Sequence, residues 1–298
     1  METILITGGS GLIGTHLQTL LSENGYNVRI LSSRQSNNNF YWNIEKGEID
    51  RNAIEGVDHI IHLAGTNISE KRWTSKQKQS ILDSRIKSAK LLYDTIQSLE
   101  QKPKTYISAS AIGYYGAITS EHVFSETDNP ASDFLGTVCE KWEQAANCFE
   151  NLGLRVVKLR TSVVLTKQGG VLEKLATPTR FGFGASIGTG KQYFPWIHID
   201  DLCEMYLKAI SNKSINGSYN AVAPQHCTNR EFTKTVAKVL HRPIILPAIP
   251  SIILRIAFGE MADLLLKGSR VSCQKIIDSN FRFRFPTLEL ALKDLLKK

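Results

Sequence analysis

Hydrophobic residues at the start of the chain form a short unbroken run and then recur every three or four positions. Residues 4–6 are apolar and long enough for one buried strand, and leucines at 17, 20 and 21 have helical spacing. Between them lies a turn with glycines at 8, 9, 11 and 14. Strand, glycine turn and helix in this order predict a dinucleotide-binding βα unit, because the free N–H groups of the helix N-terminus attract phosphate.

The spacing of the glycines assigns each of them a physical role. We expect Gly8 to allow the tight turn, Gly11 to let the backbone approach a pyrophosphate, and Gly14 to let the helix lie close to the strand. Leu12 and Ile13, at the start of the helix, complete the predicted phosphate-binding segment.

Apolar segments alternate with helical patterns along the rest of the chain, which predicts an α/β fold with a Rossmann-type, doubly wound parallel sheet. Strands are expected at 26–31, 57–63, 105–111, 154–165 and 217–222, with a buried helix at 75–98 and a loop at 37–39. Residues 1–225 form the predicted dinucleotide-binding Rossmann domain, with residues 170–195 contributing to a substrate cleft. Residues 226–298 form a small C-terminal substrate lobe with helices near 229–240, 250–266 and 287–296. Asp200 or Asp201 is expected to cap the helix after 196–199.

Cations at two places bear on the identity of the dinucleotide. A NAD-binding fold has an acidic residue after its second strand, but here Ser33 and Arg34 occupy that place. A hydroxyl and a guanidinium suit a 2′-phosphate and predict NADP(H); the alternative is that Arg34 is a surface residue. Arg85, within 75–98, either reaches a cofactor phosphate or is a solvated helix charge. We interpret His62 as a packed strand-end residue rather than an acid or base.

The pattern Gly8-x-x-Gly11-x-x-Gly14 resembles the extended short-chain dehydrogenase/reductase superfamily, which includes nucleotide-sugar epimerases. Segments 71–73, 110–116, 139–143 and 194–201 are similar to one subfamily, the bacterial and mitochondrial "epimerase family" proteins related to NAD-dependent epimerase/dehydratases. The resemblance covers nearly the whole chain. It implies NADP(H) binding but no particular substrate.

The resemblance also implies roles for individual residues. Leu63, Ala64 and Gly65 match the turn beneath the adenosine–pyrophosphate part of the cofactor, and Val164 matches a backbone contact near the nicotinamide. Ser110 matches the strand-end serine that hydrogen-bonds the reacting hydroxyl or carbonyl.

The chain departs from the superfamily at the usual catalytic pair, Tyr-x-x-x-Lys, in which the lysine holds the ribose and lowers the pKa of the tyrosine. No tyrosine here has a lysine four positions later, and Phe134 and Val138 are expected at the positions of the pair. Tyr114 is the candidate proton donor; Cys139 and Lys141 are alternatives, and Cys139 could instead have a redox role. The leading hypothesis is therefore an NADP-dependent oxidoreductase or epimerase-like enzyme acting on a hydroxyl or carbonyl group. The alternative is a catalytically degenerate NADPH-binding sensor or interaction protein.

Composition excludes several other classes. The 298 residues are 42% hydrophobic and 21% charged, without an apolar run of membrane-spanning length, and a strand begins at once, so we expect a cytoplasmic protein without a leader or membrane partner. Five scattered cysteines predict reduced thiols rather than disulfides or a metal site. The net charge is +8, and residues 201–298 carry 15 Lys and Arg against 8 Asp and Glu. The excess of basic residues in 201–298 either forms a solvated basic face or attracts a small anionic substrate. No nucleic-acid-binding module is recognisable. A homodimer is expected by analogy alone.

Overall fold

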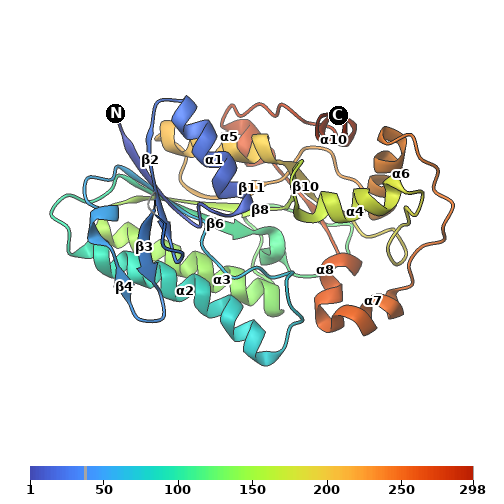
Figure 1. Ribbon diagram of the computed structural model, residues 1–298, viewed down its shortest axis with the longest axis horizontal. Helices are drawn as coiled ribbons and strands as arrows, with labels where there is room; N and C mark the ends of the chain where they lie inside the picture. The colour runs from blue at the N-terminus through green and yellow to red at the C-terminus, as the bar shows by residue number, and fades with distance from the viewer. Residues whose placement is uncertain (37–38, 298) are drawn as a thin grey trace.

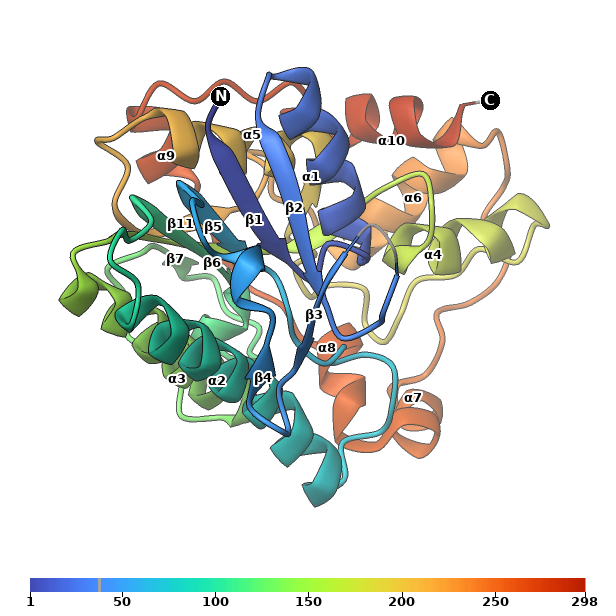
Figure 2. The ribbon, with the colours of Figure 1, turned by 60° about the vertical axis from the view of Figure 1, so that its left-hand side comes forward.

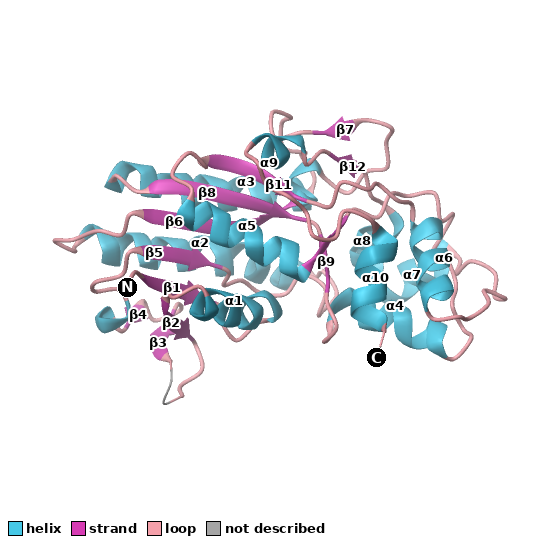
Figure 3. Ribbon diagram, turned by 90° about the horizontal axis from the view of Figure 1, so that it is seen from above, coloured by secondary structure: helices cyan, strands magenta, loops and turns pink. Residues whose placement is uncertain are grey.

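The computed structural model describes residues 1–36 and 39–297, so most of the predicted loop 37–39 lies outside the described residues. An eight-stranded sheet has the order β11-β8-β6-β5-β1-β2-β3-β4 and is parallel except for the β3–β4 pair (Figure 3). Its strands are β1 (Thr3–Thr7), β2 (Asn27–Ser32), β3 (Phe40–Asn43), β4 (Glu48–Ile49), β5 (His59–His62), β6 (Thr105–Ala111), β8 (Arg155–Thr161) and β11 (Gly217–Ala221). The predicted doubly wound α/β fold is confirmed.

Helices cover both faces of this sheet (Figure 1). One face packs on α1 (Leu12–Glu23) and α5 (Ile199–Ser211), and the other on α2 (Ser75–Gln97) and α3 (Phe134–Asn147). Figure 2 shows α2 and α3 side by side below the sheet. The central strands divide their apolar residues between the faces, so that Ile4 and Ile6 of β1 join the core beneath α1 and α5 while Leu5 joins the other core.

A smaller lobe beyond the sheet has its own apolar core. It contains α4 (Gly170–Arg180), α6 (Asn229–Val239) and α10 (Leu288–Leu296), which pack around Phe232 and Leu292. The remaining elements of the whole molecule are short. The helices are α7 (Ser251–Phe258), α8 (Asp263–Leu266) and α9 (Gln274–Asp278), and two pairs of strands are β9 (Val163–Leu165) with β10 (Trp196–His198) and β7 (Val123–Phe124) with β12 (Arg270–Val271). The 3-10 turns are η1 (Arg51–Ala53), η2 (Ile112–Tyr115), η3 (Cys148–Leu152) and η4 (Gly259–Ala262). The lobe is thus built from residues on both sides of β11.

Three local predictions need correction. The expected strand 154–165 is divided at Ser162, where the chain leaves the large sheet and β9 pairs with β10 instead. The expected helix 250–266 is broken at Gly259, which has a φ of +60°. The N-cap of α5 is His198, whose ring accepts from the Asp200 N–H. Asp201 instead accepts backbone N–H bonds from Arg284 and Phe285, so it holds the C-terminal segment. Within the described residues, no helix combines the length and apolarity needed to cross a membrane.

Candidate functional site

The glycine turn joins β1 to α1 and fits closely against its neighbours. Gly8 has a φ of +70°, and a Cβ added there would lie 3.0 Å from the Ala64 nitrogen. A Cβ on Gly14 would lie 2.5 Å from the Gly9 Cα, so the helix can approach the turn this closely only with glycine at position 14. Gly11 caps α1 without a side-chain hydrogen bond to the first turn. The first N–H groups of the helix, including those of Leu12 and Ile13, are therefore available to a phosphate.

The end of β2 carries an exposed hydroxyl and an exposed guanidinium. Ser33 and Arg34 follow the strand directly, and the Arg34 N–H donates to the Ser32 hydroxyl. Within the part of the chain that the structure describes, Arg34 has no salt-bridge partner. Ser33 borders a cavity of about 600 Å³ between the β3–β4 hairpin and α2, which Thr66 and Lys76 also line. This end of the sheet therefore offers unpaired positive charge beside a hollow.

Leu63 and Ala64, which follow β5, are held by hydrogen bonds to the neighbouring strand β1. Thr7 accepts the Leu63 N–H at its carbonyl and the Ala64 N–H at its hydroxyl. The buried ring of His62 lies between the Thr7 hydroxyl at 2.8 Å and the Ser88 hydroxyl at 3.0 Å. Burial, to which the Arg85 charge adds, lowers the pKa of His62 to about 3. His62 is thus a neutral packed residue at neutral pH.

Arg85 is buried at the centre of α2, so its interpretation as a solvated helix charge is wrong. Its Nη1 donates to the Thr66 carbonyl at 3.2 Å and to the Ile81 carbonyl at 2.9 Å. A Cβ added to Gly65 would lie 3.2 Å from the Arg85 Cζ, so Gly65 leaves room for the guanidinium. The side chain therefore lies at the end of β5, directly beneath the turn 63–65.

Ser110 is held in a buried charged cluster. Only 3% of it is exposed, and its hydroxyl donates to Oε1 of Glu143 at 2.7 Å. Arg160 donates to both oxygens of the same carboxylate, from Nε at 2.8 Å and from Nη2 at 3.0 Å. A hydroxyl whose proton is given to Glu143 cannot polarise a substrate carbonyl. In this structure Ser110 anchors Glu143, since helix α3 presents a carboxylate to this face of β6. Its expected contact with a substrate hydroxyl or carbonyl stays a prediction.

Tyr114 lies on the turn η2 beside the same cluster. The Arg160 guanidinium stacks 3.5 Å from the centre of its ring, and the side chain is half-buried. Burial raises the pKa of Tyr114, although the Arg160 charge acts in the opposite direction. Tyr114 is therefore a protonated phenol at neutral pH, able to donate a proton rather than accept one.

The first turns of helix α3 present different side chains to Trp73 and to Gly113. Phe134 packs edge-on against Trp73 with ring centres 5.0 Å apart. Leu135 and Cys139, four residues apart, supply the atoms nearest to a Cβ added at Gly113, at 3.4 and 3.6 Å. Neither of these two side chains moves a proton at neutral pH, and the assignment of Phe134 and Val138 to the positions of the pair stays a prediction.

Cys139 does not have the properties of a redox thiol. It is buried, and burial together with the Glu143 carboxylate raises its pKa to about 12, although the Arg85 charge opposes this. A reactive cysteine needs an exposed thiol of lowered pKa, so the redox hypothesis is wrong. Lys141 lies on the exposed side of α3. Val164 is half-buried in β9 opposite Ile197, at the entrance to the second lobe.

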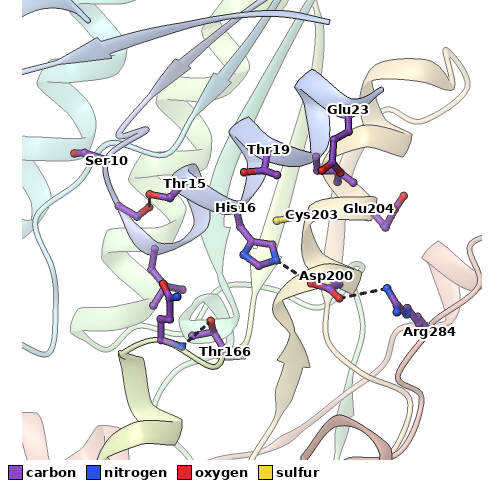
Figure 4. Close-up of a pocket in the computed structure, with 14 residues that line it drawn as sticks. Ser10, Thr15, His16, Thr19, Glu23, Thr166, Asp200, Cys203, Glu204 and Arg284 are labelled. Carbon is purple, nitrogen blue, oxygen red and sulfur yellow. Dashed lines mark hydrogen bonds and ion pairs between the residues drawn. The ribbon is translucent and has the colours of Figure 1, made fainter. Parts of the chain in front are cut away.

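A second cavity, of about 460 Å³, runs along α1 toward α5 and is also lined by Ser10, Gly11 and Leu12 of the glycine turn (Figure 4). In it Asp200 accepts from His16 at 2.9 Å and pairs with Arg284 at 3.5 Å. Glu23 and Glu204 also line the hollow, so its carboxylates outnumber its cations. The carboxylates lie where α1 meets α5 and the C-terminal segment, whereas Gly11 and Leu12 of the predicted phosphate-binding segment line the same cavity.

The buried acid–base pair was missed from the sequence, although a signal was present. Glu143 lies on the face of α3 that otherwise carries apolar residues at helical spacing, such as Leu135, Cys139 and Trp142. A lone carboxylate on an apolar helix face predicts a buried partner of opposite charge. That partner, Arg160, comes from β8, and the sequence alone could not identify it.

Comparisons with known protein families agree with the fold. A model described as the NAD dependent epimerase/dehydratase family matches residues 4–221, and one described as a domain of unknown function (DUF1731) matches residues 249–295. The epimerase family protein YfhF of Bacillus subtilis is 38% identical over 298 residues, covering 98% of this chain and 97% of its own length.

Solved structures are similar as well. A crystal structure of the human epimerase family protein SDR39U1 with NADPH has a TM-score of 0.90 and 32% identity, with 98% of each chain covered. MoeE5 in complex with UDP-glucose and NAD has a TM-score of 0.78 but only 19% identity, covering 98% of this chain and 97% of its own, so this likeness concerns the fold alone.

Proposed function

Because the chain belongs to the NAD-dependent epimerase/dehydratase family of extended short-chain dehydrogenases/reductases, we propose that it is an NADP(H)-dependent oxidoreductase or epimerase-like enzyme. The observation that carries the choice of NADP(H) is the pair Ser33 and Arg34, exposed at the end of β2 without a carboxylate partner among the described residues. A guanidinium there attracts a 2′-phosphate, whereas a carboxylate would repel it.

The residues that would hold the cofactor follow the ends of successive strands. The glycine turn with Leu12 and Ile13 would bind the pyrophosphate, and Leu63, Ala64 and Gly65 would lie beneath it. The adenosine would extend toward the cavity that Ser33 borders. The relative SDR39U1, at 32% identity, is described with NADPH, which supports the same choice.

The reaction proposed is hydride exchange between the nicotinamide and a carbon that carries a hydroxyl or carbonyl group. In the reducing direction the substrate carbonyl gains a hydride at carbon and a proton at oxygen. Tyr114 is our candidate for the proton, because it is a neutral phenol beside the Arg160 charge. The basic C-terminal third favours a small anionic substrate.

A non-catalytic NADPH-binding protein is the second candidate. It is favoured by the face of α3 toward Gly113, where Leu135 and Cys139 provide no group that exchanges protons near neutral pH. A screen of sugar nucleotides, aldehydes and ketones distinguishes the two. Substrate-dependent loss of NADPH absorbance supports the enzyme, and its abolition by Tyr114→Phe would support the role of the phenol.

The first test is calorimetric titration of the purified protein with NADPH and, separately, with NADH. Preference for NADPH is expected. Equal or tighter binding of NADH would overturn the assignment of Arg34 to a 2′-phosphate. Failure to bind either dinucleotide would overturn the proposed function as a whole.

A further inference from the structure

Arg85 is a buried cation that no carboxylate neutralises. Only 8% of it is exposed, and Nη1 is engaged with two backbone carbonyls while Nε has no hydrogen-bond partner. None of the carboxylates in the described residues lies within salt-bridge distance of it. Arg160, buried in the same region, has Glu143. Because an unpaired buried charge is costly, such a group is retained where something else compensates it.

The fold builds a specific position for this guanidinium. Its Cζ lies 4.6 Å from the centre of the Trp142 ring, on helix α3. On the other side Gly65 comes so close that a Cβ would lie 3.2 Å from the Cζ. A cation–π contact and a glycine therefore hold the group in place and leave the buried Nε–H without a described protein acceptor. Nη1 is the guanidinium nitrogen that donates in the described hydrogen bonds, so Nη2 has donors left for a ligand.

The position of Arg85 in the fold indicates which half of a bound dinucleotide it would contact. In a doubly wound sheet the two nucleotide halves lie on opposite sides of the first strand. Here β2, with Arg34, lies on one side of β1, and β5 and β6 lie on the other. Arg85 lies under the end of β5 and against Trp142 of α3, the helix whose Cys139 approaches Gly113 after β6. It is thus on the side of the nicotinamide half.

Helix α3 lacks the lysine that the superfamily places beside the nicotinamide ribose. The superfamily's lysine would project from α3 and hold the nicotinamide ribose, but the α3 residues facing Gly113 are Leu135 and Cys139. We infer that Arg85, from the neighbouring helix α2, takes the place of this lysine and binds the hydroxyl groups of the nicotinamide ribose. This inference rests on the proposed NADP(H) function. It makes Arg85 a cofactor-positioning residue and replaces the expectation that it contacts a phosphate.

A series of ligands, each longer than the last, tests the inference without a substrate. Adenosine 2′,5′-bisphosphate contains only the adenosine end, 2′-phospho-ADP adds the second phosphate, 2′-phospho-ADP-ribose adds the ribose, and NADPH adds the nicotinamide. Affinities are measured by calorimetry for the natural protein, Arg85→Met and Arg85→Lys. Lys90→Met is the matched control, because it removes an exposed cation from the same helix.

The expected loss in Arg85→Met appears first at the ribose. The two shorter ligands should bind as they do to the natural protein, while 2′-phospho-ADP-ribose and NADPH should bind roughly tenfold or more weakly. Arg85→Lys should recover part of the loss, since it keeps the charge but not the planar group. Circular dichroism and thermal unfolding show whether each variant is folded, and the lysine variant carries the test if the methionine variant is not.

Other outcomes overturn the inference in different ways. A loss that begins with 2′-phospho-ADP means a phosphate contact, and equal losses for all four ligands mean a structural role. Unchanged affinities for all four mean that Arg85 does not meet the cofactor. In each of these cases the proposed function stands. If the natural protein binds none of the four ligands, both the inference and the proposed function are overturned.

Discussion

The Ser110 hydroxyl donates a 2.7 Å hydrogen bond to Glu143, across the interface between β6 and α3. The same carboxylate accepts two hydrogen bonds from Arg160 of β8 and one from the Ser218 hydroxyl on β11. Three strands of the sheet are therefore tied to one carboxylate on one helix. Since β6 ends in the turn that carries Tyr114, this cluster also fixes the candidate proton donor.

The first prediction concerns this cluster. Glu143→Gln leaves the Arg160 guanidinium buried without a charged partner, so we expect a loss of about 3–5 kcal/mol in the free energy of unfolding. Ser110→Ala removes one hydrogen bond and should cost about 1–2 kcal/mol. Urea denaturation measures both. Equal effects of the two substitutions would show that Arg160 does not depend on the Glu143 charge.

The second prediction concerns the specificity for the cofactor. Arg34→Gln removes the guanidinium that we assign to the 2′-phosphate, so NADPH should bind roughly 10- to 100-fold more weakly while NADH binding is unchanged. Calorimetry measures both dinucleotides. Lys46→Gln, which removes another exposed cation near this edge of the sheet, is the control and should alter neither affinity. A parallel loss of both dinucleotides in Arg34→Gln would contradict the assignment.

Local features of the fold could be predicted because their causes are local. The glycine turn needs a positive φ at Gly8 and a close approach at Gly14, and both requirements are recorded in a few neighbouring residues. The parallel sheet follows from apolar strands that alternate with helical periods. The break between β8 and β9 at Ser162 was missed, because continuous hydrophobicity does not show where a strand changes its pairing partner.

The candidate site was less predictable because it depends on rotation and on distant partners. A shift of one residue turns a helix face by about 100°, so Phe134 and Leu135 fit the same spacing, but Leu135 lies nearest to Gly113 and Phe134 packs on Trp73. Ser110 was recognised as a strand-end serine, yet its partner lies 33 residues away. Arg85 was noticed as a cation, and only the fold shows that it is buried against Trp142.

The third prediction concerns stability at low pH. His62 has a folded-state pKa of about 3 because burial excludes its charged form, whereas an unfolded histidine titrates near 6.5. Below pH 6.5 the unfolded chain binds a proton that the folded chain does not, so stability present at higher pH is lost as the pH falls. His62 should account for a loss of about 2 kcal/mol between pH 7.5 and pH 5.

Urea denaturation at several pH values measures this contribution. His62→Gln should show a smaller loss over that range than the natural protein, even if it is less stable at pH 7.5 because the bonds to Thr7 and Ser88 change. His241→Asn is the control, since this histidine is exposed and asparagine tolerates its positive φ. If His62→Gln keeps the full pH dependence, the histidine is not buried in its neutral form.

The fourth prediction separates the cysteines by their exposure. All five thiols are free, but only Cys148 is exposed, while Cys139 and the other three are buried. Burial raises the pKa of Cys139 to about 12, and the thiolate is the reactive form, so Cys139 is protected by both access and protonation. Alkylation of the folded protein at pH 7.5 should therefore modify one thiol rapidly. Mass spectrometry of peptides should assign it to Cys148, and Cys148→Ser should abolish the rapid phase.

Rapid modification of Cys139 in the folded protein would restore the redox hypothesis. It would mean that the contact between α3 and Gly113 opens in solution, which would expose the region in which Arg85 is expected to meet the cofactor.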